Sequence, residues 1–155
     1  MSVPTRAKRR RWWGVVRYEV QMFRVMSSLQ AAPGIANNLL TEGLILHARN
    51  LCAVCLSPNQ NDITLRDLFD DFTNGFKYAK LRNLRDRLCR KYGKGRGSAR
   101  WAFNKKLAHP TKERSTRYNY APRLKRVHQT IVDVIDEIES LRRRKFPDIL
   151  VRVTP

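Results

Sequence analysis

Cysteines, acidic residues and long apolar runs are all scarce in this sequence. Three cysteines, an odd number without an extracellular spacing pattern, argue against a disulfide framework and predict a reducing, cytoplasmic environment. No apolar run approaches the roughly 20 residues that span a bilayer. The basic start lacks a signal-peptide core, because Gly14, Arg17 and Glu19 interrupt the apolar residues that follow it. We therefore expect no membrane partner.

What the chain does contain is enough apolar material for a folded core. Its 155 residues and 18.2 kDa suit one domain of ordinary size. Hydrophobic residues make up 42% of the chain, which excludes a disordered basic tail.

The scarcity of acids leaves a formal net charge of +19, from 32 Lys and Arg against 13 Asp and Glu. Residues 77–126 alone hold eighteen basic and two acidic residues, a net +16. A field concentrated in this way attracts polyanions; nucleic acid is the first candidate and anionic lipid is the second. A solvated cationic face without a ligand is the alternative.

Apolar residues recur at three- and four-residue steps along most of the chain, which is the period of an amphipathic helix. Thr64 and Ser98 are suited to cap two short helices, with Asp67 completing a capping box. The apolar stripe of the second helix is so wide that we expect burial on most of its sides. The predicted helices are 13–29, 35–56, 65–72, 78–92, 99–108 and 122–145.

Without internal repeats or strand-helix alternation, these elements predict an all-α fold, a bundle of four to six helices. We predict a basic N-terminal arm at 1–12, a single helical domain at 13–146 and a C-terminal tail at 147–155.

Two short motifs carry candidate chemistry of limited scope. Cys52 and Cys55 form a C-x-x-C pair, but a structural zinc needs four ligands and the chain has only one other cysteine. Their apolar neighbours favour core packing, so no metal and no other cofactor is predicted. The glycine-rich loop 93–98 lacks the spacing of a nucleotide P-loop, yet it can hold a backbone phosphate. The predicted nucleic-acid contacts are Lys91, Lys94, Arg96, Lys106 and Lys112.

The stretch from Arg100 to Arg114 combines one histidine with several cations. On a helix that ends before Pro110, the side chains of Asn104, Lys105 and His109 fall close together. An imidazole that accepts a proton, beside cations that hold a phosphate, is the minimum for metal-free RNA cleavage. The alternative, which the spacing alone favours, is that His109 caps the helix C-terminus.

The chain resembles HEPN-type domains, a family of small α-helical bundles, over roughly residues 15–142. The motifs that carry the resemblance are Asn104 to His109, with Thr111 and Arg114 following, and Glu42, His47, Arg49 and Asn50 on the second helix. The order of long helices, polar-histidine motif and closing helix also agrees, so the resemblance implies a HEPN-like topology.

Many HEPN domains are metal-independent ribonucleases in which two copies meet to form one cleft. Their motif is an arginine, four to six residues and a histidine. Here the resemblance implies His109 as the acid or base, but none of residues 102–104 is an arginine. The predicted catalytic residues are His109, Asn104 and Arg100, supported by Glu42, His47, Arg49, Asn50, Lys105, Thr111 and Arg114. Arg49, Arg114 and Lys105 are the alternative sources of the motif's cation.

The predicted function is therefore directed at RNA, with DNA as the alternative nucleic acid. One hypothesis is a cytoplasmic, metal-independent endoribonuclease of toxin or defence type that works as a homodimer and has a cognate inhibitor protein. The other is a module on the same fold that binds nucleic acid without cleaving it, or that forms a dimer through the second helix.

Overall fold

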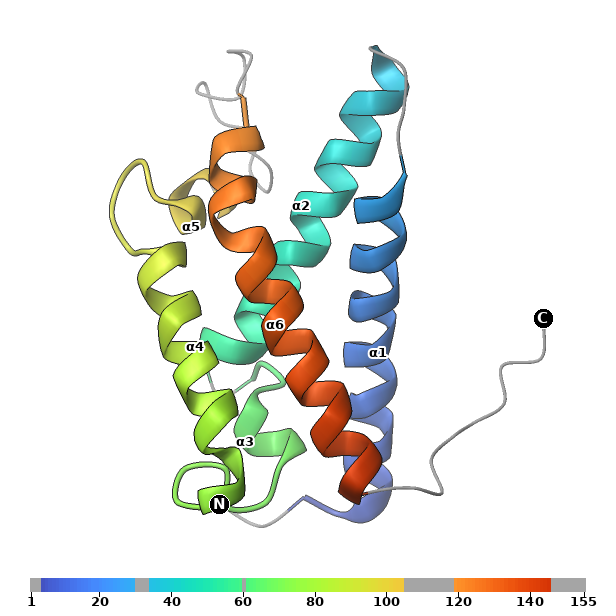
Figure 1. The fold of residues 1–155 in the computed structure, drawn as a ribbon. Helices are drawn as coiled ribbons and strands as arrows, with labels where there is room; N and C mark the ends of the chain where they lie inside the picture. Colours follow the sequence, from blue (N-terminus) through green and yellow to red (C-terminus); the bar gives the residue numbers. More distant parts are fainter. Residues whose placement is uncertain (1–3, 30–33, 60, 105–118, 146–155) are drawn as a thin grey trace, which may run out of the picture.

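The computed structural model describes residues 4–29, 34–59, 61–104 and 119–145, and the fold is given for these residues. They form six α-helices, one 3-10 turn and no strand (Figure 1). In chain order the elements are α1 (Arg6–Ser28), α2 (Ile35–Leu56), α3 (Leu65–Leu68), η1 (Phe76–Tyr78), α4 (Ala79–Tyr92), α5 (Ala99–Ala102) and α6 (Ala121–Lys145). The predicted all-α bundle is confirmed.

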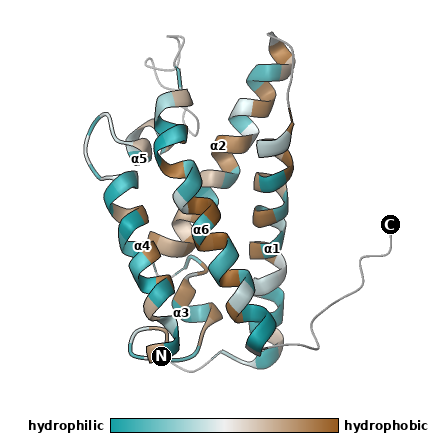
Figure 2. Ribbon diagram, in the orientation of Figure 1, coloured by the Kyte–Doolittle hydropathy of each residue, from teal (hydrophilic) through white to brown (hydrophobic). Residues whose placement is uncertain are grey.

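The four long helices form the bundle because each of them has an apolar stripe to bury. Helix α1 packs chiefly on α2 and helix α4 chiefly on α6, while α2 also contacts α4 and α6. Hydropathy alternates along each long helix, as an amphipathic pattern requires (Figure 2). The largest fully buried side chains are Tyr78, Phe23, Phe69, Phe103, Ile45, Leu65, Leu68, Leu81, Leu88, Ile131, Ile135 and Val16.

The N-terminal residues predicted as an arm belong to the bundle, because α1 begins at Arg6 rather than near residue 13. Thr5 caps the helix by accepting a hydrogen bond from the backbone N–H of Lys8 (3.3 Å). Arg9 then fixes this turn to the α3 region. Its Nε donates to the carbonyl of Asp67 at 3.2 Å, and its guanidinium pairs with Asp70 at 2.5 Å. The predicted arm is wrong for residues 6–12.

Both predicted short-helix caps are confirmed. Thr64 and Asp67 form a capping box at α3, and the Ser98 hydroxyl accepts a hydrogen bond from the N–H of Trp101 at α5. Helix α3 is shorter than the predicted 65–72, because the backbone of Phe69 is extended. This turn of the chain lets both Phe69 and Phe72 enter the core.

Helix α2 has the predicted bounds but not the predicted burial. All its buried residues lie from Ile45 onward, whereas Ile35 and Leu39 are 79% and 65% exposed. The expectation of burial on most sides is therefore wrong for the first half. Helix α2 is long enough, and its mean hydropathy of 1.4 is high enough, to cross a membrane. The core helix of a soluble protein meets the same two criteria. The expected absence of a membrane partner remains a prediction.

Candidate functional site

The motif His47-Ala48-Arg49-Asn50 is divided between two faces of α2. His47 is 6% exposed, and its Nδ1 lies 2.7 Å from Oε2 of Glu19 on α1. Asn50 donates to the same carboxylate oxygen at 3.1 Å. Positions three residues apart share a helix face, which explains why both side chains reach α1. His47 and Asn50 therefore join α1 to α2 and do not line the pocket described next.

Glu19 is a partner that the sequence analysis missed. Its signal was present in the sequence, because Glu19 is the only acidic residue before Glu42 and lies among the apolar core positions Val16, Val20 and Phe23 of α1. An acid at such a position needs a buried polar partner. Glu42, which was predicted as a supporting residue, is exposed on α2.

Arg49 lies on the other side of α2 and lines a pocket with Lys94, Arg100 and Asn104. These residues come from three places in the sequence: α2, the 93–98 loop, and α5 with the residues that follow it. We call this space, of about 220 Å³, the cationic pocket. Its lining consists of Arg49, Cys52, Ala53, Leu56, Ser57, Pro58, Asp62, Cys89, Tyr92, Gly93, Lys94, Arg100 and Asn104.

Tyr92 lines the cationic pocket, and the pKa of its phenol responds to the charges there. Burial raises the pKa of its phenol, the Cys52 thiol adds to this rise, and Arg49 and Arg100 both oppose it. Two guanidinium groups from distant segments thus act on one buried hydroxyl. Three cations against one acid, Asp62, give the pocket an excess of positive charge that favours an anionic ligand.

The loop that carries Lys94 is held in place at both ends. Gly93 and Gly97 have positive φ angles of 69° and 84°, which favour glycine. Arg123 of α6 donates from Nε to the carbonyl of Gly97 at 3.2 Å. The Arg96 guanidinium lies 6.0 Å from the ring centre of Trp101, at the outer range of a cation–π contact. These features fix the backbone of the loop that carries Lys94 and Arg96.

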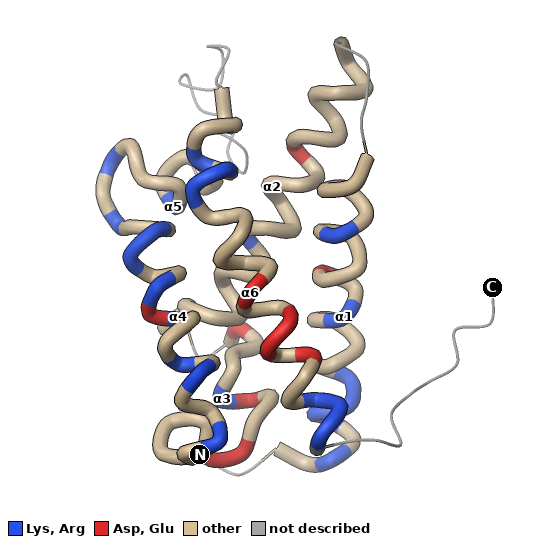
Figure 3. Tube along the Cα trace, in the orientation of Figure 1, with Lys and Arg blue, Asp and Glu red and all other residues tan. Residues whose placement is uncertain are grey.

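Ion pairs reduce the charge that part of the basic segment can offer. Acidic residues gather midway along α6, and basic residues line α4 (Figure 3). Glu137 pairs with Lys80 at 2.5 Å, and Asp133 pairs with Arg87. Two cations of α4, Lys80 and Arg87, are thus neutralised by acids of α6.

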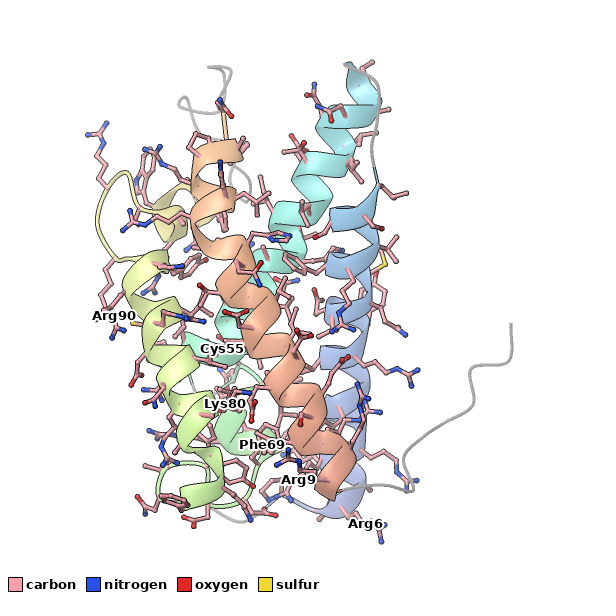
Figure 4. The ribbon with its side chains drawn as sticks, in the orientation of Figure 1. Arg6, Arg9, Cys55, Phe69, Lys80 and Arg90 are labelled. Carbon is pink, nitrogen blue, oxygen red and sulfur yellow. The ribbon has the colours of Figure 1, made fainter. Side chains whose placement is uncertain are left out.

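The end of α4 and the loop that follows it retain their charge. Among the residues that the structure describes, no acid pairs with Arg90, Lys91, Lys94, Arg96 or Arg100. Arg90 points outward from α4, whereas Cys55 lies inside the bundle (Figure 4). The end of the bundle that holds the cationic pocket therefore offers several unpaired cations to an anionic ligand.

The C-x-x-C pair is part of the core. Cys52 and Cys55 are buried, and burial raises the pKa of both thiols, that of Cys55 to about 12. Protonated thiols are poor metal ligands and poor nucleophiles. No group of three or more potential metal ligands occurs in the described residues.

Six predicted site residues lie outside the described residues: Lys105, Lys106, His109, Thr111, Lys112 and Arg114. Of the described ones, Arg49, Lys94, Arg100 and Asn104 come together in one pocket. Lys91 and Arg96 belong to the same charged end of the bundle.

Comparisons of the chain with protein-family models, curated proteins and solved structures found no match.

Proposed function

We propose that the protein binds RNA, with the cationic pocket holding one backbone phosphate and the neighbouring cations holding adjacent phosphates. The observation that carries the proposal is the meeting of Arg49 and Arg100, 51 positions apart in the chain, in a single pocket with Lys94. Guanidinium groups bind phosphate oxygens through paired, charge-assisted hydrogen bonds. Two such groups and an ammonium suit one phosphate, and the nearby cations suit a chain of them.

A single-stranded nucleic acid fits this end of the bundle better than a duplex. Single strands are bound by cationic grooves with aromatic or guanidinium faces that stack on bases. Trp101 is half-buried with Arg96 above its ring, and the two residues are close in sequence to Arg100 and Lys94 of the cationic pocket. DNA single strands are the alternative ligand of the same chemistry.

RNA cleavage is the second candidate, favoured by the presence of Arg100 and Asn104 together with Arg49. In this proposal the ribose 2′-oxygen attacks the adjacent phosphorus and the P–O5′ bond breaks, which leaves a 2′,3′-cyclic phosphate and a 5′-hydroxyl. His109 transfers the proton from the 2′-hydroxyl to the leaving 5′-oxygen, as in HEPN ribonucleases. Arg49 and Arg100 replace the motif arginine by stabilising the charge on the phosphate. A cytoplasmic toxin of this kind would also need a cognate inhibitor protein.

The binding proposal is tested by the salt dependence of affinity for single-stranded RNA, measured by fluorescence anisotropy. Each phosphate contact contributes about −0.7 to the slope of log K against log salt. The double variant Arg49→Ala, Arg100→Ala should weaken binding and reduce the slope by up to roughly 1.4. Arg143→Ala, Arg144→Ala is the matched control, since it removes the same charge at the far end of α6 (Figure 1).

Equal effects of the two double variants would contradict a dedicated phosphate pocket. Cleavage is tested separately, by incubating RNA with the protein in EDTA. Products ending in a cyclic phosphate, absent with His109→Ala, are expected for the ribonuclease. RNA that binds and stays intact would refute the cleavage proposal and leave only the binding proposal.

We further propose that two copies associate through α1 and α2. Seven of the eight exposed large apolar side chains of the described residues lie on these helices or, in the case of Leu29, at the C-cap of α1: Val15, Tyr18, Val25, Leu29, Ile35, Leu39 and Leu46. Their spacing of three, four and seven residues gives stripes suited to helix packing. No charged residue occurs between Arg24 and Glu42. A second copy is the fitting partner, because here two chains of charge +19 approach with the least repulsion.

Light scattering after size-exclusion chromatography tests the dimer. Leu39→Asp should shift the protein towards the monomer, because it places a charge in the stripe. Phe76→Asp is the matched control: Phe76 is 92% exposed and is the one exposed large apolar residue of the described set outside α1, its C-cap and α2. A wild-type protein that stays monomeric at every concentration tested would refute the dimer.

A further inference from the structure

A second, larger pocket of about 500 Å³ adjoins the cationic pocket. The two spaces share five lining residues and therefore lie next to each other, beside the end of α2 and the second half of α4; we call the two together the groove. The shared residues are Leu56, Ser57, Pro58, Asp62 and Cys89. Sites for small organic ligands typically measure roughly 300–1,000 Å³. The larger pocket falls within that range, whereas the cationic pocket is smaller and suits a phosphate group.

The walls of the larger pocket combine apolar surface with a few polar groups. Leu56 and Pro58 supply apolar lining that a ligand can contact, with the buried Leu65 and Phe72 behind it. The half-buried Arg85 adds a planar guanidinium. A base that has left its stack is commonly held between such surfaces in single-stranded RNA recognition. The lining therefore suits a flat heterocycle more than a second phosphate.

Two carboxylates, Asp62 and Asp67, line the larger pocket, and of these two only Asp62 also lines the cationic pocket. Oδ2 of Asp67 accepts from both the N–H and the hydroxyl of Thr64, each at 2.8 Å, in the α3 capping box. Oδ2 of Asp62 accepts from the hydroxyl of Ser57 at 2.5 Å. Within the described part of the chain, no hydrogen bond engages Oδ1 of Asp62. Asp62 is half-buried and lines both pockets, so it stands at their junction.

Ser57 holds the Asp62 carboxylate in a defined orientation. Its hydroxyl accepts from the N–H of Asn59 at 3.1 Å while donating to Asp62. A carboxylate fixed in this way beside a phosphate pocket opposes the binding of a polyanion. The opposition is offset if the carboxylate accepts hydrogen bonds from the ligand, because a carboxylate oxygen accepts more than one.

Among the four RNA bases, guanine matches a carboxylate best. Its Watson–Crick edge presents two adjacent donors, N1–H and the N2 amino group, which a carboxylate can accept together. Adenine and cytosine each place a ring-nitrogen acceptor beside their single amino donor, and that acceptor repels the carboxylate. Uracil offers one N–H between two carbonyl groups.

We infer that the groove selects guanine in single-stranded RNA, with the base in the larger pocket, Asp62 at its Watson–Crick edge and a neighbouring phosphate in the cationic pocket. The inference rests on the proposed RNA binding and adds a base preference to it. It requires no change in the protein's covalent structure and no cofactor.

The test compares three uridine octamers that differ only at one central base: guanine, inosine or adenine. All three carry the same charge, so the phosphate contacts are common to them. Inosine keeps N1–H and lacks the N2 amino group, so its affinity should be roughly tenfold below that of guanine. Adenine should bind more weakly still.

Asp62→Asn should bring the three affinities to within about twofold of one another, because an amide presents both a donor and an acceptor. Asp136→Asn is the matched control: it removes the same charge from an exposed position on α6 that does not line the groove. It should leave the preference for guanine unchanged.

Equal binding of the three octamers by the wild-type protein would overturn the guanine preference and leave the proposed RNA binding intact. So would a preference that persists in Asp62→Asn. Absence of binding to any octamer would instead overturn the proposed function, and with it this inference. The comparison of the guanine and inosine octamers uses only the wild-type protein, so it tests the guanine preference even if Asp62→Asn fails to fold.

Discussion

Replacing Glu19 by alanine should destabilise the protein strongly while leaving its RNA affinity unchanged. Glu19 accepts hydrogen bonds from His47 and Asn50 through one carboxylate oxygen, at 2.7 and 3.1 Å. The side chains of Glu19 and His47 are only 13% and 7% exposed. The variant therefore leaves two polar groups at the α1–α2 contact without their acceptor.

The magnitude follows from the burial of these groups. An unsatisfied buried donor costs about 1–3 kcal/mol, and breaking a buried pair from one side costs about 3–5 kcal/mol. Because Glu19 and Asn50 retain some access to water, we expect a loss of about 3 kcal/mol at the lower end of the second range. Glu19→Gln keeps one acceptor oxygen and should lose about half as much.

Urea denaturation followed by circular dichroism measures this loss. With an m-value of about 2 kcal/mol/M, Glu19→Ala should lower the midpoint by about 1.5 M. Asp86→Ala, at an exposed pair with Arg85, should change stability by less than about 0.5 kcal/mol. A loss below about 1 kcal/mol for Glu19→Ala would refute the structural role assigned to His47 and Asn50.

Two further predictions concern the core. Phe69 is fully buried, with its ring centre 5.3 Å from those of Trp13 and Tyr78, so Phe69→Ala should cost about 3–5 kcal/mol by urea denaturation. Phe76→Ala, at a 92% exposed position, should cost under about 0.5 kcal/mol, and similar losses for both would contradict the assigned packing. In the native protein at pH 8, a thiol reagent should modify only the exposed Cys89, because burial raises the pKa of Cys55 to about 12 and that of Cys52 as well. All three thiols should react in urea, and reaction of all three in the native protein would contradict the core assignment. Protonation of the two buried thiols contributes fully to stability below pH 9. This contribution falls as the pH rises towards 12, because the unfolded chain releases these protons at lower pH than the folded protein does.

Local features of the fold could be predicted from the sequence. The bounds of α2 and the caps at Thr64 and Ser98 depend on residues within one or two turns of each other, and the structure has them where the sequence predicted them. The length of α1 could not be predicted in this way. Its first turn is fixed by the contact of Arg9 with Asp67 and Asp70, about 60 positions away.

The candidate site, like the fold, could be predicted from the sequence only in part. The sequence by itself determined the helical class, the excess of positive charge and the residue types Arg49, Lys94, Arg100 and Asn104, because composition and periodicity are properties of the chain alone. Only the tertiary structure decided that Arg49 faces these three residues while His47 and Asn50 face Glu19. It also decided that acids on α6 neutralise Lys80 and Arg87 of α4. Helix periodicity fixes which residues share a face, but the packing of helices distant in sequence determines what each face meets.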